Sequence, residues 1–365
     1  MAQIEFDAVY MTKVYNAFIA RLNLEQPYFL GVLPREQVVS TLVEKDVMGG
    51  KYVRVPNMMS GLVDVMPSVA HGQNPVKLDS VKFDVDKVKF DHFFIQTDLG
   101  VQDFEEAHHQ LNAILSGETP HRTARDVSVM LYGNDFKRAR IAYNNKLTLF
   151  WYQLISNGEF EVLRDIHNDP YFYKVKGYET LTMKKSDFLA NPVAALLKLR
   201  DFVISNGGEV TSINLGSEIA TEFLTTEWLK KQMQFLKVSG FNYEPVQAIN
   251  PNNQTIAAKG IYDITMLGDI PVRQVSTKIK VGDVVRDAFD PNAIVAMAER
   301  KVGKLYTTPT LRNFGNGNFQ YDSSDMSYYK HKESDMHVSH RSAGFFLPAV
   351  THPQNIGKLI LTDDD

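Results

Sequence analysis

The sequence predicts an α+β protein with an extended two-stranded ribbon, one long helix and a separate α/β layer. Residues 81–86 alternate apolar and charged side chains with a period of two, which predicts a strand with one covered face. Residues 123–157 repeat apolar side chains three or four apart, which predicts a helix. Residues 209–215 predict a strand between two amphipathic helices, which is typical of an α/β layer.

Composition excludes several classes of site. The chain has 365 residues, 39 Lys and Arg against 43 Asp and Glu, a formal net charge of −4 and no cysteine. That length corresponds to about two domains of roughly 150 residues. A sequence without cysteine has no disulfide, thiolate zinc site or cysteine nucleophile. The slight acidic excess disfavours a dedicated nucleic-acid-binding protein, which needs a surplus of Lys and Arg, but not a protein that encloses nucleic acid.

Neither a signal peptide nor a membrane span is expected. Residues 1–24 place Glu5 and Asp7 ahead of the apolar residues and have no basic segment followed by a continuous apolar stretch. The most apolar late segment, residues 343–350, is far shorter than the roughly 20 residues that span a bilayer. We therefore expect synthesis in the cytoplasm.

The N-terminal part predicts extended structure without a core of its own. Residues 1–40 mix aromatic residues with turn formers, which fits an arm packed on another surface, with a short helix as the alternative. Residues 44–98 are β-like and interrupted by prolines and glycines. The alternation of residues 81–86 resumes at 88–90 after one extra residue, Lys87, which predicts a β-bulge. Because an isolated ribbon is marginal in water, we expect it to lie on a neighbour.

Two helices are expected after the ribbon. Asp103 is predicted to cap the first, with Glu106 as its capping-box partner and Gly117 as its stop. The second, residues 123–157, would span roughly 52 Å at 1.5 Å per residue, unless Gly133-Asn134 divides it. A helix of that length would act as a spine that joins the two ends of an elongated subunit.

The rest of the chain predicts alternating strands and helices. Asn191 and Pro192 supply a cap and a first-turn proline, which mark the start of a helix. The expected elements are strands at 160–183, a helix at 193–204, a strand at 209–215, a helix at 217–237, a strand pair at 262–275 that turns at Gly268-Asp269, a buried strand at 293–298, an exposed polar segment at 321–332 and strands at 337–361.

Loops and carboxylates supply no predicted catalytic site. Asn313–Phe319 is glycine-rich but lacks the third glycine of a dinucleotide loop and the Gly-Lys-Ser/Thr end of a phosphate loop, so a surface loop is favoured. Asp84 and Asp86 share a strand face, but no pocket is predicted beside them. The acidic run Asp363–Asp365 is expected to be a solvated tail.

Histidines are the remaining candidates for a metal site. His331, His337 and His340 cluster in the sequence, but an offset of three along a strand puts His337 and His340 on opposite faces. His108 and His109 are adjacent on a helix and point about 100° apart. Surface or interface histidines are therefore favoured. We assign no catalytic, cofactor-binding or metal-ligating residue, and we expect no cofactor.

The order of the elements and several short stretches together carry a resemblance. The stretches are Val43–Val47 before the ribbon, Asn144–Phe160 at the end of the long helix, Asp290–Asn292 before a buried strand, and Ser342–Leu361 with Leu347-Pro348 and His352-Pro353. In this order of arm, ribbon, spine helix, α/β layer and returning strand, the chain resembles the major capsid proteins of tailed bacteriophages with the Hong Kong 97-type fold, specifically the lambda-type family.

The resemblance implies a division into an N-terminal arm (1–40), an E-loop ribbon (41–98), a peripheral domain with the spine helix (99–190), an α/β axial domain (191–335) and C-terminal strands returning to the peripheral domain (336–365). It implies that the ribbon lies over the neighbouring subunit. The second face of the ribbon would then come from another copy, and its pairing energy would arise only on assembly.

In function, the resemblance implies a structural protein and not an enzyme. The expected role is a major capsid protein that assembles as hexamers and pentamers into an icosahedral shell around double-stranded DNA. Expected partners are further copies, portal and scaffolding proteins, a decoration protein, and DNA contacted non-specifically, without a membrane. Two alternatives stay open: a nanocompartment shell protein of the same fold, and a two-domain cytoplasmic α/β enzyme with a site formed by residues 313–319 and 331–340.

Overall fold

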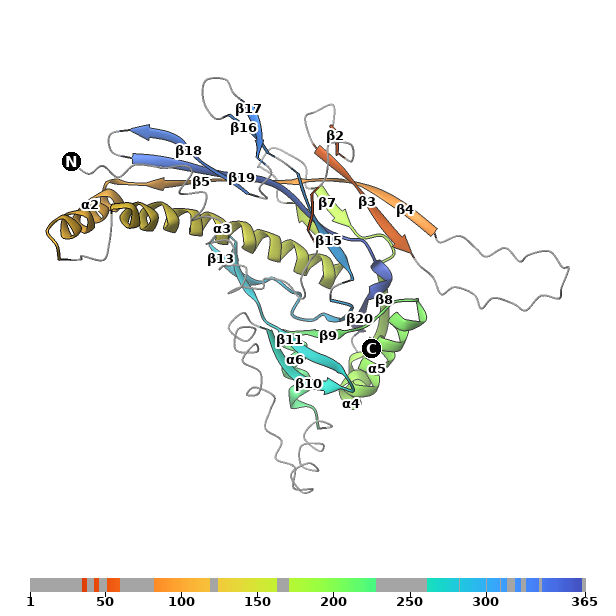
Figure 1. Ribbon diagram of the computed structural model, residues 1–365. Coiled ribbons are helices and arrows are strands. Elements are labelled where there is room, and N and C mark those ends of the chain that lie inside the picture. The colour runs from red at the N-terminus through yellow and green to blue at the C-terminus, as the bar shows by residue number, and fades with distance from the viewer. Residues whose placement is uncertain are drawn as a thin grey trace, which may run out of the picture.

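The chain forms an elongated subunit built along one long helix (Figure 1). A computed structural model describes residues 35–37, 43–45, 51–59, 82–118, 124–162, 171–227, 261–281, 283–299, 301–308, 310–313, 319–322, 326–334 and 337–362. A sheet lies along one side of the helix, and a second α/β module lies on the other side near its C-terminal end (Figure 1).

Helices and strands alternate along the described chain. The helices are α2 Val101–Leu115, α3 Ala124–Asn157, α4 Lys185–Ala190, α5 Pro192–Ser205, α6 Ser217–Thr225 and the 3₁₀ turn η2 Pro353–Asn355. The strands are β1 Arg35–Gln37, β2 Val43–Lys45, β3 Lys51–Met59, β4 Lys82–Lys89, β5 Asp91–Leu99, β6 Glu159–Val162, β7 Tyr171–Lys174, β8 Glu179–Lys184, β9 Ser212–Gly216, β10 Ile261–Leu267, β11 Ile270–Val275, β12 Lys278–Val281, β13 Val284–Asp287, β14 Ile294–Met297, β15 Gly303–Thr308, β16 Thr310–Asn313, β17 Phe319–Asp322, β18 Ser327–Ser334, β19 His337–Val350 and β20 Ile356–Thr362.

Helix α3 is the predicted spine, and it runs unbroken through Gly133 and Asn134 over 34 residues. At 1.5 Å per residue it is about 51 Å long. Large side chains are buried around its C-terminal half, and this packing outweighs a glycine cost of about 1 kcal/mol. The helix ends where predicted, because Gly158 has a φ of +73° and its N–H donates to Leu154 O.

Strand β19 is the long strand of the sheet that covers α3. Its 14 residues pair antiparallel with β5, β18 and β15, and β1 adds parallel to β15. Aromatic rings join this sheet to the helix: Tyr143 lies edge-on to Phe93, with centroids 5.3 Å apart, and to Phe346 at 5.1 Å. The sheet therefore fixes one side of the spine.

Strands β2, β3 and β4 form the predicted ribbon, but the predicted bulge at Lys87 is wrong. Strand β4 pairs with β3 from Lys82 to Lys89 without a shift of register. The apolar side chains move from odd to even positions for another reason. Val88 and Phe90 are buried, because the ribbon reaches the core above α3 at this point. From there β3 and β4 extend away from the body of the subunit (Figure 1).

Helix α2 begins earlier than the sequence predicts. Gly100, not Asp103, is the N-cap, and Asp103 is the third helical residue. Its Oδ2 accepts a hydrogen bond from Gly100 N at 2.9 Å, so Asp103 takes the part expected of Glu106. The predicted stop is confirmed, because Gly117 follows the helix with a φ of +81°.

The second module is a six-stranded sheet with α4, α5 and α6 packed on it. Its strand order is β10-β11-β9-β14-β20-β8. Helix α5 begins as predicted, since Asn191 Oδ1 accepts a hydrogen bond from Ala194 N at 3.1 Å and Pro192 is the first helical residue. The predicted turn between β10 and β11 and the buried strand β14 are also confirmed. This module has its own core, which includes Leu199 and Leu359.

The predicted helix at 217–237 is interrupted. Helix α6 ends at Thr225, because Thr226 is extended with φ −62° and ψ 142°. The backbone N–H and the hydroxyl of Thr226 both donate to Phe223 O, which closes the last turn.

Several predictions lie outside the described residues. They concern the arm before residue 35, residues 60–81 of the ribbon, the turn at 168–170, residues 228–237, the glycine-rich segment 314–318 and the tail 363–365. Among the helices of the described segments, none combines the length and the apolar composition that crossing a membrane requires.

Candidate functional site

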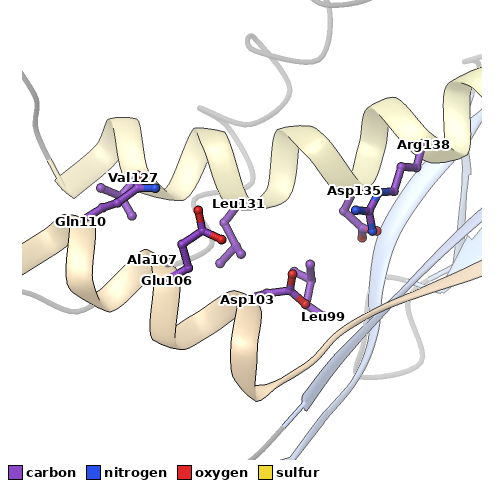
Figure 2. Close-up of a pocket in the computed structure, with 9 residues that line it drawn as sticks. All are labelled: Leu99, Asp103, Glu106, Ala107, Gln110, Val127, Leu131, Asp135 and Arg138. Carbon is purple, nitrogen blue, oxygen red and sulfur yellow. The ribbon is translucent and has the colours of Figure 1, made fainter.

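Helices α2 and α3 leave a pocket of about 170 Å³ between them at the far end of the subunit from the ribbon (Figures 1 and 2). The pocket is lined by Leu99, Asp103, Glu106, Ala107, Gln110, Val127, Leu131, Asp135 and Arg138. Its apolar members are buried, whereas Glu106 and Arg138 are exposed at its rim. Figure 2 shows the Glu106 carboxylate and the Leu131 side chain directed toward each other across the gap between the helices. We call this pocket the α2–α3 groove.

A buried carboxylate forms the inner end of the α2–α3 groove. Asp135 is 2% exposed, and its Oδ2 accepts a hydrogen bond from Thr97 Oγ1 at 2.9 Å. His340 is fully buried, and its Nδ1 lies 2.9 Å from the same oxygen. These contacts tie α3 to β5 and β19. The polar cluster therefore fixes the helix against the sheet at the point where the groove begins.

His340 corrects one prediction from the sequence. A surface or interface histidine was expected, but His340 is in the interior because α3 covers this face of β19. His108 and His109 are exposed on α2, as expected. Strands β18 and β19 carry His331 and His337, whose side chains lie outside the described set. In the described part of the chain, no three or more His, Asp and Glu side chains form a group that could hold a metal ion.

A second polar cluster joins the two modules at the C-terminal end of α3. Tyr178 donates its hydroxyl to Ile155 O at 2.7 Å, and Asp290 N donates to Ser156 Oγ of α3 at 3.4 Å. Burial raises the pKa of Tyr178, and the Asp290 carboxylate raises this pKa further. These two hydrogen bonds fasten the second module to the C-terminal end of α3.

Helix α2 and the β3–β4 ribbon carry opposite charge. Helix α2 contains three acidic residues, Asp103, Glu105 and Glu106, and no Lys or Arg. Strands β3 and β4 contain five basic residues, Lys51, Arg54, Lys82, Lys87 and Lys89, and two acidic residues, Asp84 and Asp86. Figure 1 shows α2 at one end of α3 and the ribbon at the other. This separation favours contacts between copies over a contact within one chain.

The α2–α3 groove was not predicted from the sequence. Its lining comes from β5, α2 and α3, so no local motif marks it. One signal was present: Asp135 lies one turn from Leu131 and one turn from Ala139, so a carboxylate interrupts the apolar stripe of the predicted spine. A charged residue in such a stripe indicates either a paired interior group or a site.

The fold matches a crystal structure of a protein assigned to the capsid of a prophage in E. coli CFT073. The TM-score is 0.55, and the match covers 95% of this chain and 98% of that chain at 9% sequence identity. The chain has a phage-capsid fold. The match confirms the predicted α+β class of Hong Kong 97 type. At this identity the likeness concerns the fold and not individual residues.

Weaker likenesses are to a virus-like particle from Pyrococcus furiosus and to the mature capsid of bacteriophage PhiM1. The first has a TM-score of 0.43 at 12% identity and covers 96% of this chain and 98% of that chain. The second has a TM-score of 0.45 at 12% identity and covers 92% and 87%. The fold assignment rests on the prophage protein, whose score is higher. The sequence itself matches no protein-family profile and no curated protein.

Proposed function

We propose that the chain is a major capsid protein of a tailed phage, of the lambda-type family. Its copies assemble as hexamers and pentamers into an icosahedral shell that encloses double-stranded DNA. One observation carries the proposal, namely the fold likeness to the prophage capsid protein over 95% of this chain and 98% of that one. Such coverage leaves no large segment of this chain for an unrelated catalytic domain.

The shape of the subunit supports this role. The spine of about 51 Å separates a ribbon at one end from the α2–α3 groove at the other (Figure 1). The ribbon buries side chains only where it joins the core, at Val53, Val55 and Val88 among its described residues. A projecting ribbon of this kind gains its remaining packing from a neighbouring copy, so association stabilises it by mass action.

The domain division is part of the proposal, with adjustments taken from the strand pairing. Residues 1–40 form the arm, 41–98 the E-loop ribbon, 99–190 most of the peripheral domain and 191–335 most of the axial domain. Strands β8 and β20 belong to the axial domain, because β8 pairs with β20 and β20 with β14. Helix α4 packs beside these two strands and belongs with them. Strands β15 and β18 join the peripheral domain, because both pair with β19 beside α3.

The partners follow from the same role. Portal and scaffolding proteins would direct assembly in the host cytoplasm, a decoration protein would bind the finished shell, and the chain would become part of the virion. The DNA would be contacted non-specifically, since a net charge of −4 gives the chain little overall attraction for phosphates. No cofactor is needed for this work.

Purification followed by sedimentation and negative-stain electron microscopy tests the proposal. We expect closed particles, formed by the chain alone or with a co-expressed scaffolding protein. Particles from phage-producing cells should protect double-stranded DNA from nuclease, whereas a nanocompartment would contain a protein cargo. A compact monomer that no scaffolding protein drives into particles would overturn the proposal, and turnover by that monomer would support the enzyme alternative.

A further inference from the structure

The α2–α3 groove has the chemistry to hold a long basic side chain. Its buried apolar floor, which includes Val127 and Leu131, suits the methylenes of a lysine or arginine. Within the described residues Glu106 has no hydrogen-bond or ion-pair partner, and it stands at the rim where a cationic head would lie. Three carboxylates line the groove, those of Asp103, Glu106 and Asp135, against the one guanidinium of Arg138.

The ribbon is the segment of this chain that complements the groove. Strands β3 and β4 carry five basic residues against two acidic ones, whereas α2 carries three acidic residues and no Lys or Arg. The ribbon and the groove lie at opposite ends of α3, which is about 51 Å long, so the ribbon of a chain points away from its own groove (Figure 1). Complementary charge at opposite ends of one molecule favours contact between copies.

We propose that the α2–α3 groove receives a basic side chain from the β3–β4 ribbon of a second copy. The contact is head-to-tail, because the groove of one subunit meets the ribbon of the next, and such a contact repeats around a ring. The inference rests on the proposed function and adds the surface that receives the ribbon. It gives a role in partner recognition to Glu106, which has no partner among the described residues of its own chain.

Charge reversal at Glu106 tests the contact, with Glu105 as the matched control. Glu105 is exposed on the same helix but does not line the groove. We expect Glu106→Lys to lower the fraction of chains in particles by about tenfold at low salt, and Glu105→Lys to lower it by less than about twofold. Circular dichroism of the unassembled variants verifies folding. Equal losses for both variants would show that diffuse charge, and not the groove, is responsible, and would overturn the proposal.

Cross-linking separates this inference from the shell function, because the chain has no cysteine of its own. A chain carrying Glu106→Cys is mixed with tagged chains carrying Lys51→Cys, Lys82→Cys, Lys87→Cys or Lys89→Cys, and a short bismaleimide is added. We expect a mixed dimer with at least one ribbon variant and far less with Glu105→Cys. Particles without this cross-link would overturn the groove contact alone. A cross-link without particles would support the contact and count against the shell, and the absence of both would overturn both proposals.

Discussion

The two cores of the subunit differ in what they are made of and in how completely the chain itself covers them. The core around α3 is rich in aromatic side chains, such as Tyr143, Phe150 and Trp151. The core of the six-stranded sheet is mainly aliphatic and is covered by α4, α5 and α6, which belong to the same module. The first core opens into a projecting ribbon at one end and a groove at the other. The second has no comparable opening among its described residues.

This difference indicates that the six-stranded module serves mainly to fold the subunit and the spine module serves also to assemble it. The six-stranded module covers one face of its sheet with its own helices, whereas Val275, Val295 and Met297 on the other face belong to the core around α3. The spine module holds its elements in place with a few large rings and leaves its ends for neighbours. The ribbon and the α2–α3 groove then gain their remaining packing, and the stability that it supplies, only when copies associate. If the two regions are separate units, a change in one core should leave the other core protected from exchange.

Trp151→Ala should have the largest effect, and the loss should be confined to the spine module. Trp151 is fully buried, and an added Cβ at Gly303 on β15 would lie 2.9 Å from its ring, so helix and sheet touch here. Removing a buried indole costs about 3–5 kcal/mol. Hydrogen exchange with mass spectrometry should show faster exchange in α3 and β19, with β9 and β14 protected as before. Equal loss of protection in both modules would contradict their independence.

Leu199→Ala is the converse change in the second core. Leu199 of α5 is fully buried, and deletion of its side-chain methyls should cost about 2–5 kcal/mol. The same exchange experiment should now report β9, β14 and α5, while α3 stays protected. Because each variant serves as the other's control, a single shared unfolding transition in both would show that the subunit is one cooperative unit.

The two regions also differ in how far the sequence predicts them. In the six-stranded module the signals are local: Asn191 caps its own helix, and Gly268 makes its own turn with a φ of +63°. Such features depend on residues a few positions apart, so a sequence displays them directly. The end of α6 is the exception, because Thr226 becomes extended at a place where helical periodicity continues.

In the spine module two of the misses share a tertiary cause. His340 is buried because α3 crosses its strand, and Val88 changes the phase of the ribbon because the core begins there. The burial of His340 leaves no trace in the neighbouring sequence, and the start of the core at Val88 shows there only as a change of phase that does not reveal its cause. The α2–α3 groove likewise exists only when three elements meet. The length of α3 was predictable, since its period is local, but what its faces contact was not.

Asp135→Ala should have a moderate effect at the boundary between the buried and the open part of α3. The change removes the acceptor of the Thr97 hydroxyl and the partner of His340 Nδ1. Leaving buried polar groups without a partner costs about 1–3 kcal/mol, and denaturant unfolding should show this loss. Exchange should rise first in the N-terminal half of α3. Asn145→Ala, a half-buried position on the same helix, is the control; an equally large loss there would contradict a special role for Asp135.

Tyr178→Phe should have the smallest effect at neutral pH, about 1 kcal/mol, because it removes the hydrogen bond to Ile155 O at the seam between the modules.

Above pH about 10 the unfolded chain releases the tyrosine proton, whereas burial, and then Asp290, raises the pKa of Tyr178 in the folded chain. The folded state therefore holds more protons than the unfolded state, and stability present below about pH 10 is lost as pH rises. Tyr178→Phe should make this alkaline loss shallower when unfolding is measured between about pH 8 and pH 11. Burial also raises the pKa of Tyr152, which would contribute to the slope that remains, and Tyr152→Phe is the matched comparison. An unchanged slope in Tyr178→Phe would mean that Tyr178 ionises in the folded chain, and that the seam opens to water without unfolding of either module.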